Sequence, residues 1–193
     1  MIEKYELYLQ LLGAKLDKFF TKQKPYIKCK PGCSFCCEDG QYPYSQLEFN
    51  YLMVGFEKLP EDIKQLIKEK IQKIKKEQSE FKGDTFYYEC PFLINKFCSV
   101  YHYRGIICRT HGLPYFVDDN ERIKIPACTL KGLNYADVYD KEAKTFTTEK
   151  FKATGYDVEP LSFNLSLKFL LCPEIEESLG IKFGESKALI ERL

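Results

Sequence analysis

The cysteines are the residues of this chain whose type and spacing point most directly to chemistry. Eight of the nine form one ordered series, with four inside a nine-residue stretch and four at wider intervals: Cys29, Cys33, Cys36, Cys37, Cys90, Cys98, Cys108 and Cys128. Thiolates bind soft metal ions, and sets of four hold structural zinc or an iron–sulfur cluster. We therefore expect all eight to be metal ligands. Cys172 stands apart in an apolar run, which indicates a buried free thiol.

The ligand count and one adjacent pair predict more than one metal atom. Eight thiolates suffice for two sites of four ligands each. Cys36 and Cys37 are neighbours, and in extended backbone neighbouring side chains point to opposite faces, so we expect them to serve two nearby sites or one multinuclear site. Tetrahedral sulfur sites suit both zinc and iron–sulfur clusters. The Cys90-Pro91 pair and the many nearby aromatic residues slightly favour an iron–sulfur cluster.

The net charge and the length of the apolar runs limit which binding partners we expect. The 193 residues carry 29 Lys and Arg against 28 Asp and Glu, a net charge of +1, which argues against nucleic-acid binding by phosphate neutralisation. No apolar run approaches the roughly 20 residues of a membrane span, and the N-terminal segment lacks the uninterrupted apolar stretch of a signal peptide. We expect a cytoplasmic protein that binds metal ions, with no nucleic-acid or membrane partner. A protein partner is left open. In a reducing compartment many cysteines indicate metal or catalysis rather than disulfides.

Three helices are predicted to support the cysteines. Residues 2–22 carry apolar side chains at alternating spacings of four and three, which is typical of one helix face. Ser45 and Glu48 match a capping box before an apolar-rich run to Leu59. A third helix is expected from Pro60 to about residue 81. Its lysines between 64 and 76 alternate with glutamates and isoleucines, which indicates a solvated face.

Two hairpins are predicted in the cysteine-rich stretch 86–128. Asn95-Lys96 fits a two-residue turn, and residues 118–121 fit the turn of a second hairpin in which Val117 faces Arg122. This register would place Cys128 opposite His111 and return it towards Cys108. His111, and less directly His102, are therefore alternative ligands, although the thiolates already suffice.

These elements predict a mainly α fold with small β-hairpins, an irregular α+β arrangement in which a cysteine-rich metal-organised module packs on long helices. We expect a single domain over 1–193, with the module at about 25–130 and a C-terminal part, 131–193, of unknown role. Residues 163–172 are apolar enough for a buried strand or helix, and residues 186–193 indicate a short terminal helix.

The ordered motifs resemble those of the YkgJ-like cysteine-cluster family, also described as a zinc- or iron-chelating domain. The resemblance covers residues 29–128 and rests on CKPGCSFCC at 29–37, CPFL at 90–93, CSVY at 98–101 and RGIICR at 104–109. It implies metal chelation by these cysteines, with Tyr101, Arg104 and Arg109 as accompanying positions around the cofactor. Two departures concern loops: Gly105 stands where the family usually has proline, and Asn95-Lys96-Phe97 replaces a turn that usually carries glycine.

Two enzyme hypotheses stand beside simple chelation. The cysteine cluster is similar to that of flagellin lysine-N-methylases, which implies cluster-assisted protein methylation by analogy. Cys29, Cys33 and Cys36 also match the CxxxCxxC pattern of radical S-adenosylmethionine enzymes, but these need a barrel of alternating strands and helices that the sequence does not predict. Phosphate-binding, nucleophile-elbow and HExxH motifs are absent. Whether the protein is an enzyme stays open.

Overall fold

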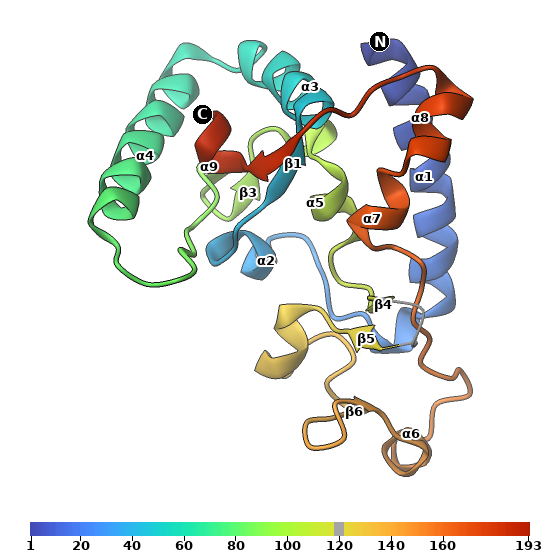
Figure 1. The fold of residues 1–193 in the computed structure, drawn as a ribbon. Coiled ribbons are helices and arrows are strands. Elements are labelled where there is room, and N and C mark those ends of the chain that lie inside the picture. Colours follow the sequence, from blue (N-terminus) through green and yellow to red (C-terminus); the bar gives the residue numbers. More distant parts are fainter. Residues whose placement is uncertain (118–121) are drawn as a thin grey trace. The chain divides into compact units, whose positions relative to one another are not determined.

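A computed structural model describes residues 1–117 and 122–193 of the chain. The fold is mainly helical with small antiparallel two-stranded sheets (Figure 1), which confirms the predicted fold class. The chain divides into two compact units, so the predicted module at 25–130 contributes residues to both. The expectation of a single domain stays a prediction. In the described part of the chain no helix is long and apolar enough to span a membrane.

Unit 1 comprises Met1–Tyr5, Gly32–Cys108 and Gly180–Leu193. Its elements are α2 (Phe35–Glu38), β1 (Pro43–Ser45), α3 (Gln46–Glu57), α4 (Glu61–Glu80), β2 (Leu93–Ile94), β3 (Phe97–Cys98), η2 (Tyr101–Tyr103), β8 (Ser186–Ala188) and α9 (Leu189–Arg192). Its core is an aromatic and aliphatic cluster that includes the thiol of Cys90. Three further cysteines pack against this core: Cys37, Cys98 and Cys108.

Unit 2 comprises Glu6–Pro31 and Arg109–Leu179. Its elements are η1 (Lys24–Tyr26), β4 (Tyr115–Phe116), β5 (Ile123–Lys124), η3 (Ala127–Lys131), β6 (Tyr139–Asp140), β7 (Thr145–Phe146), α6 (Thr148–Thr154), α7 (Leu167–Leu170) and α8 (Pro173–Leu179). Two helices, α1 (Ile2–Lys22) and α5 (Ile106–Thr110), have residues in both units. A small buried cluster of Tyr26, Tyr135 and Val138 lies in unit 2.

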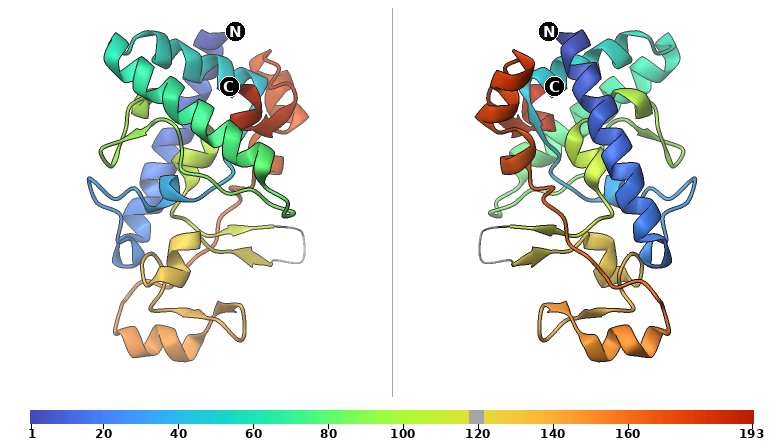
Figure 2. Two further views of the ribbon diagram at one scale, coloured as in Figure 1. Left: turned by 90° about the vertical axis from the view of Figure 1, so that its left-hand side faces the viewer. Right: turned by 90° about the vertical axis from the view of Figure 1, so that its right-hand side faces the viewer.

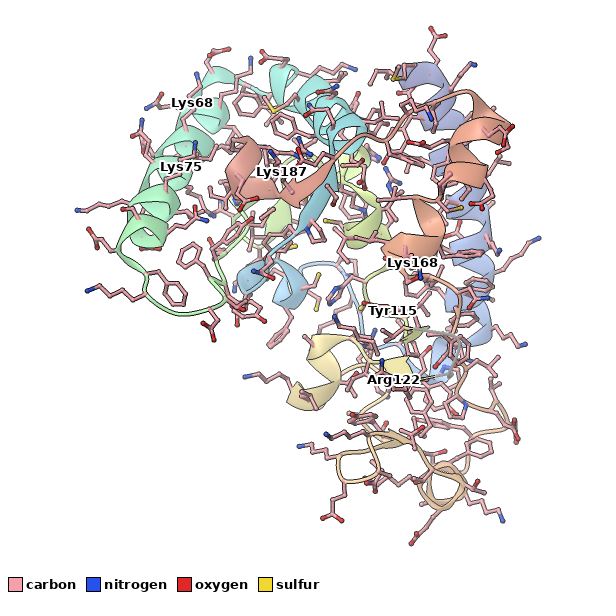
Figure 3. All side chains as sticks on the ribbon, in the orientation of Figure 1. Lys68, Lys75, Tyr115, Arg122, Lys168 and Lys187 are labelled. Carbon is pink, nitrogen blue, oxygen red and sulfur yellow. The ribbon has the colours of Figure 1, made fainter. Side chains whose placement is uncertain are left out.

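The three predicted helices are confirmed as α1, α3 and α4. The capping box of α3 is complete, because Ser45 Oγ accepts from the Glu48 N–H and the Glu48 carboxylate accepts from the Ser45 N–H. The predicted solvated face of α4 is confirmed for four of its six lysines, whereas Lys64 and Lys70 are half-buried and ion-paired. Lys68 and Lys75 are exposed on this helix, as their labelled side chains in Figure 3 show.

Both predicted hairpins form. Asn95 and Lys96 have φ values of 49° and 68°, the left-handed backbone that a type I′ turn requires between β2 and β3. β4 and β5 lie side by side (Figure 2). Phe116 is opposite Ile123, and the Val117 N–H donates to the Arg122 carbonyl, so the predicted register is confirmed. The turn assigned to residues 118–121 lies outside the described residues.

The C-terminal segment differs from its prediction. Residues 186–193 do not form one helix, because Ser186–Ala188 form β8 and only Leu189–Arg192 form α9. β8 pairs with β1, with Tyr44 opposite Lys187, so a long-range partner overrides local helix preference. In the apolar stretch 163–172, Leu167–Leu170 form α7, whereas Phe163 makes a parallel bridge to Tyr115.

Gly55 allows α3 and η2 to approach closely in unit 1. A Cβ atom at this position would lie 2.5 Å from Cγ of Tyr103, near the root of a side chain that cannot move away cheaply. We expect Gly55→Ala to lower the free energy of unfolding by about 1–3 kcal/mol, although alanine is the better helix former.

The matched control is Gly13→Ala in α1, where an added Cβ meets no atom within 4 Å. It should raise stability by about 0.5–1 kcal/mol. Urea unfolding of both variants measures the two effects. A stabilising Gly55→Ala would contradict the close packing of α3 on η2.

Candidate metal centre

Backbone hydrogen bonds join the segment that carries Cys36 and Cys37 to the segment that carries Cys90. The Cys90 N–H donates to the Cys37 carbonyl at 2.8 Å. Gly40 and Tyr88 then exchange two N–H···O=C bonds of 3.1 and 3.2 Å as an antiparallel bridge. Two motifs more than fifty residues apart in the sequence are therefore held side by side in unit 1.

Cys36 and Cys37 lie in helical rather than extended backbone. Both belong to α2, and their Sγ atoms are 3.9 Å apart. The expectation that extended backbone points these two side chains to opposite faces is therefore wrong. Two thiolates on one tetrahedral ion with metal–sulfur bonds of about 2.3 Å have their sulfurs about 3.8 Å apart. The observed spacing therefore fits two ligands of a single metal ion.

Three further thiols of unit 1 surround the same core. Cys90 is buried, and the turn that follows it, closed by a 3.0 Å bond from the Leu93 N–H to the Cys90 carbonyl, leads into β2. Cys98 lies opposite Leu93 in the β2–β3 hairpin. Cys108 lies in α5 and packs on the core. Together with the α2 pair they make a set of five thiols: Cys36, Cys37, Cys90, Cys98 and Cys108.

The five thiols influence one another's protonation. Burial raises the pKa of Cys90 and Cys98, and raises that of Cys108 to about 12. Hydrogen bonding between the adjacent pair lowers the pKa of Cys36 and raises the pKa of Cys37. Negative charge on Cys90 and Cys108 raises the pKa of Cys37 further. Each thiol of the set lies within electrostatic reach of at least one other.

Of the three residues predicted to accompany the cofactor, Tyr101 and Arg104 belong to unit 1 and Arg109 belongs to unit 2. The Arg104 guanidinium stacks over the Tyr101 ring, 3.8 Å from its centroid. Its charge helps to lower the pKa of Cys36, and it acts in the same direction on Cys98 and Cys108 against the larger effect of burial. Arg104 therefore places a positive charge within electrostatic reach of three of the five thiols. Arg109 follows Cys108 in α5 and belongs to unit 2.

The remaining predicted ligands are distributed over both units. Cys33 is exposed in unit 1, whereas Cys29 and Cys128 belong to unit 2, where Cys29 is exposed and Cys128 is buried. The β4–β5 ladder ends before it reaches His111 and Cys128, because Pro126 begins the 3₁₀ turn η3. The His111 Nε2 is buried without a hydrogen-bond partner among the described residues. Burial lowers the pKa of His111.

Asn134 is a polar contact of Cys29 that the sequence did not indicate. Its side-chain amide donates to Cys29 Sγ at 3.3 Å and to the Gly112 carbonyl at 2.9 Å. Its Oδ1 accepts from the Lys28 N–H at 2.8 Å. Asn134 thus fixes the backbone around Cys29 within unit 2. No sequence pattern marks it, because its partners Lys28, Cys29 and Gly112 are all distant from it along the chain.

Two buried residues behind Cys108 were also not predicted to belong to the site. The Tyr44 hydroxyl lies 3.5 Å from Cys108 Sγ and accepts from the Gly105 N–H at 3.0 Å. Glu48 was predicted only as a capping residue, but its carboxylate also accepts from the Ile106 N–H at 2.8 Å. Both side chains therefore hold the start of α5, the helix that carries Cys108.

The set of five thiols fits a soft metal ion in two respects. Thiolates are the ligands that such ions prefer, and the distance between the Cys36 and Cys37 sulfurs matches two ligands of one ion. Over residues 1–117 and 122–193, no three His, Cys, Asp or Glu side chains are grouped closely enough to hold an ion as they stand. A cysteine sulfur turns about a single torsion, so each sulfur can take more than one position on the same backbone. Lys96, in the turn before Cys98, forms an ion pair with the Glu38 carboxylate at 2.5 Å.

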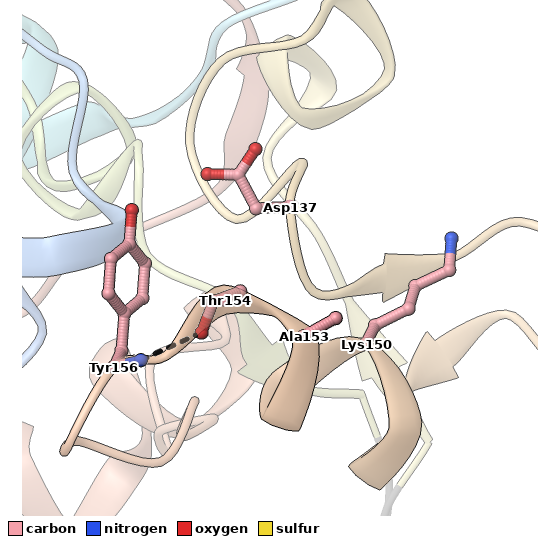
Figure 4. A pocket seen from close by; sticks show the side chains of 5 residues that line it. All are labelled: Asp137, Lys150, Ala153, Thr154 and Tyr156. Carbon is pink, nitrogen blue, oxygen red and sulfur yellow. Dashed lines mark hydrogen bonds between the residues drawn. The ribbon is translucent and has the colours of Figure 1, made fainter.

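A surface pocket in unit 2 offers no thiol. Figure 4 shows its lining residues, Asp137, Lys150, Ala153, Thr154 and Tyr156. Thr154 Oγ1 accepts from the Tyr156 N–H at 3.1 Å, and Lys150 donates to the Tyr139 carbonyl. This pocket therefore supplies polar groups that are already in use within unit 2.

Comparisons of the chain with family models, with curated proteins and with solved structures found no match.

Proposed function

We propose that this protein is a metal-binding protein whose centre is built from five of the six thiols of unit 1: Cys36, Cys37, Cys90, Cys98 and Cys108. The observation that carries the proposal is the Cys36–Cys37 pair, with sulfurs 3.9 Å apart and its backbone joined to that of Cys90 by a 2.8 Å hydrogen bond. Buried and half-buried thiols in such number are otherwise inert packing groups, but inert thiols need no matching sulfur spacing and no neighbouring guanidinium. The resemblance to the YkgJ-like cysteine-cluster family supports the same conclusion.

An iron–sulfur cluster and zinc are both compatible with these ligands, and we favour the cluster slightly. Cys90, Cys98 and Cys108 lie in or against an aromatic core that includes Phe92 and Tyr88. Such a dry surrounding protects a cluster from solvent. A fifth thiol beyond the four that a closed site needs would allow a bridged or exchangeable ligand. Cys29, Cys33 and Cys128 stay predicted ligands.

Metal analysis of anaerobically purified protein tests the proposal. We expect bound metal in stoichiometric amount. Iron with acid-labile sulfide and a brown colour identifies a cluster, whereas a colourless protein with zinc identifies a zinc site, and either result supports chelation. Protein that carries neither metal and does not take up Zn²⁺ or Co²⁺ in titration would contradict it.

The enzyme hypotheses gain less support from the fold. The sheets in the described part of the chain are two-stranded and antiparallel, so these residues do not build the strand–helix barrel of a radical S-adenosylmethionine enzyme. Protein methylation rests on the likeness of the cysteine cluster alone. Chelation is therefore the function that the geometry favours.

A further inference from the structure

Tyr44 occupies a defined position behind the Cys108 sulfur. Its hydroxyl oxygen accepts from the Gly105 N–H at 3.0 Å and lies 3.5 Å from Cys108 Sγ. A thiol could share its own proton with this oxygen, but a metal-bound thiolate has none to share. In the metal-bound state the hydroxyl must therefore be the donor and the sulfur the acceptor.

The Tyr44 ring is held in place by its surroundings. Tyr44 is 2% exposed. In the pairing of β1 with β8 it lies opposite Lys187. The backbone carbonyl of Tyr44 accepts from Arg192 Nε at 2.9 Å. A buried ring on a paired strand cannot turn its hydroxyl away from the sulfur without disturbing the core. The hydroxyl is therefore positioned before any metal binds.

Gly105 makes this arrangement possible in two ways. Its N–H supplies the hydrogen bond that orients the Tyr44 hydroxyl, and a proline at this position would have no N–H to donate. Its missing side chain leaves room for the ring, because an added Cβ would lie 2.8 Å from two Tyr44 ring carbons. The glycine that departs from the family pattern thus belongs with Tyr44.

We propose that Tyr44 is a positioning residue that donates a hydrogen bond to the metal-bound sulfur of Cys108 and weakens the electron donation of that sulfur to the metal. The inference rests on the proposed metal centre. A hydrogen bond to a ligating sulfur lowers the energy of its lone pairs, and partners of this kind typically change metal affinity by 10–100-fold.

Cobalt(II) titration of the full-length protein tests the proposal, because Co²⁺ accepts sulfur ligands and reports them by a sulfur-to-cobalt charge-transfer band. In Tyr44→Phe this band should move to lower energy, and cobalt affinity should change by about tenfold or more. The matched control is Tyr42→Phe, because Tyr42 is also buried but its hydroxyl donates to the Tyr88 carbonyl at 3.3 Å. The control should keep the wild-type band.

The possible outcomes separate the two proposals. Wild-type protein without a charge-transfer band would overturn the metal centre itself and the role of Tyr44 with it. A wild-type band that is unchanged in folded Tyr44→Phe would overturn only the role of Tyr44. If Tyr44→Phe does not fold, 3-fluorotyrosine at position 44 keeps the ring and makes the hydroxyl a stronger donor. The band should then move to higher energy, and a band that stays in place would overturn the proposal.

Discussion

Replacing Glu48 with glutamine should lower the free energy of unfolding by about 2–4 kcal/mol, because a buried hydrogen-bonded carboxylate loses an acceptor and leaves a donor unpaired. Glu48 is 0% exposed. Its two oxygens accept separately, Oε2 from the Ser45 N–H at 2.9 Å and Oε1 from the Ile106 N–H at 2.8 Å. Glutamine offers one acceptor oxygen, so its NH₂ group would face one of these two N–H donors.

Glu191→Gln is the matched control for this substitution. Glu191 also accepts from a backbone N–H three residues before it, that of Ala188 at 3.2 Å, but in an exposed position. Water can replace that bond, so the control should cost less than about 1 kcal/mol. Urea unfolding of both variants at neutral pH gives the comparison. Equal losses would show that burial of the Glu48 carboxylate does not matter.

The difference in the free energy of unfolding between wild type and Glu48→Gln should depend on pH, because only the wild type carries a titrating carboxyl group at this position. Burial raises the pKa of Glu48, against the opposing effects of its backbone hydrogen bonds and of Arg192. The folded state therefore holds this proton more tightly than the unfolded state. The stability that results is fully present below the unfolded pKa and is lost as the pH rises through the folded pKa. Both oxygens of a protonated carboxyl group can still accept from an N–H, whereas the NH₂ group of glutamine cannot, so the advantage of wild type does not need the charge. The difference between wild type and variant should be largest in acid and should shrink as pH rises.

Local signals in the sequence sufficed for the start of α3 and for the two hairpins. The Ser45 and Glu48 pair predicted the start of α3, because a capping box satisfies backbone donors within one turn. The Asn95-Lys96 turn and the Val117–Arg122 register were also predictable, because a hairpin is decided by a few adjacent residues. These signals need no knowledge of the rest of the chain.

The parts of the site that were missed depend on distant partners. Tyr44 and Cys108 are 64 residues apart in the sequence, and nothing in either neighbourhood marks their contact. α2 is four residues long, too short for a periodic pattern, and its backbone is joined to Cys90 from another segment. The helical geometry of Cys36 and Cys37, and with it the short distance between their sulfurs, therefore came only from the fold.

The double substitution Cys36→Ser/Cys37→Ser should remove the bound metal. It leaves three thiols of the proposed five-thiol centre, fewer than a closed tetrahedral sulfur site requires, so metal content per chain should fall by about tenfold or more. Both positions are half-buried, so each serine hydroxyl can reach water and should cost little in the metal-free protein. The loss of stability should therefore appear only in the presence of metal.

The size of that loss follows from linkage. A ligand held at a thousand times its dissociation constant stabilises the folded state by about 4 kcal/mol, and a protein that no longer binds it loses this contribution. Cys172→Ser is the control, because Cys172 is also half-buried but lies outside the predicted ligands, and it should keep both metal and stability. Thermal unfolding with and without added metal, together with metal analysis, measures both quantities.

Wild-type metal content in the double variant would place the metal on other residues. A double variant that is equally destabilised with and without metal would show that Cys36 and Cys37 act in packing rather than in ligation.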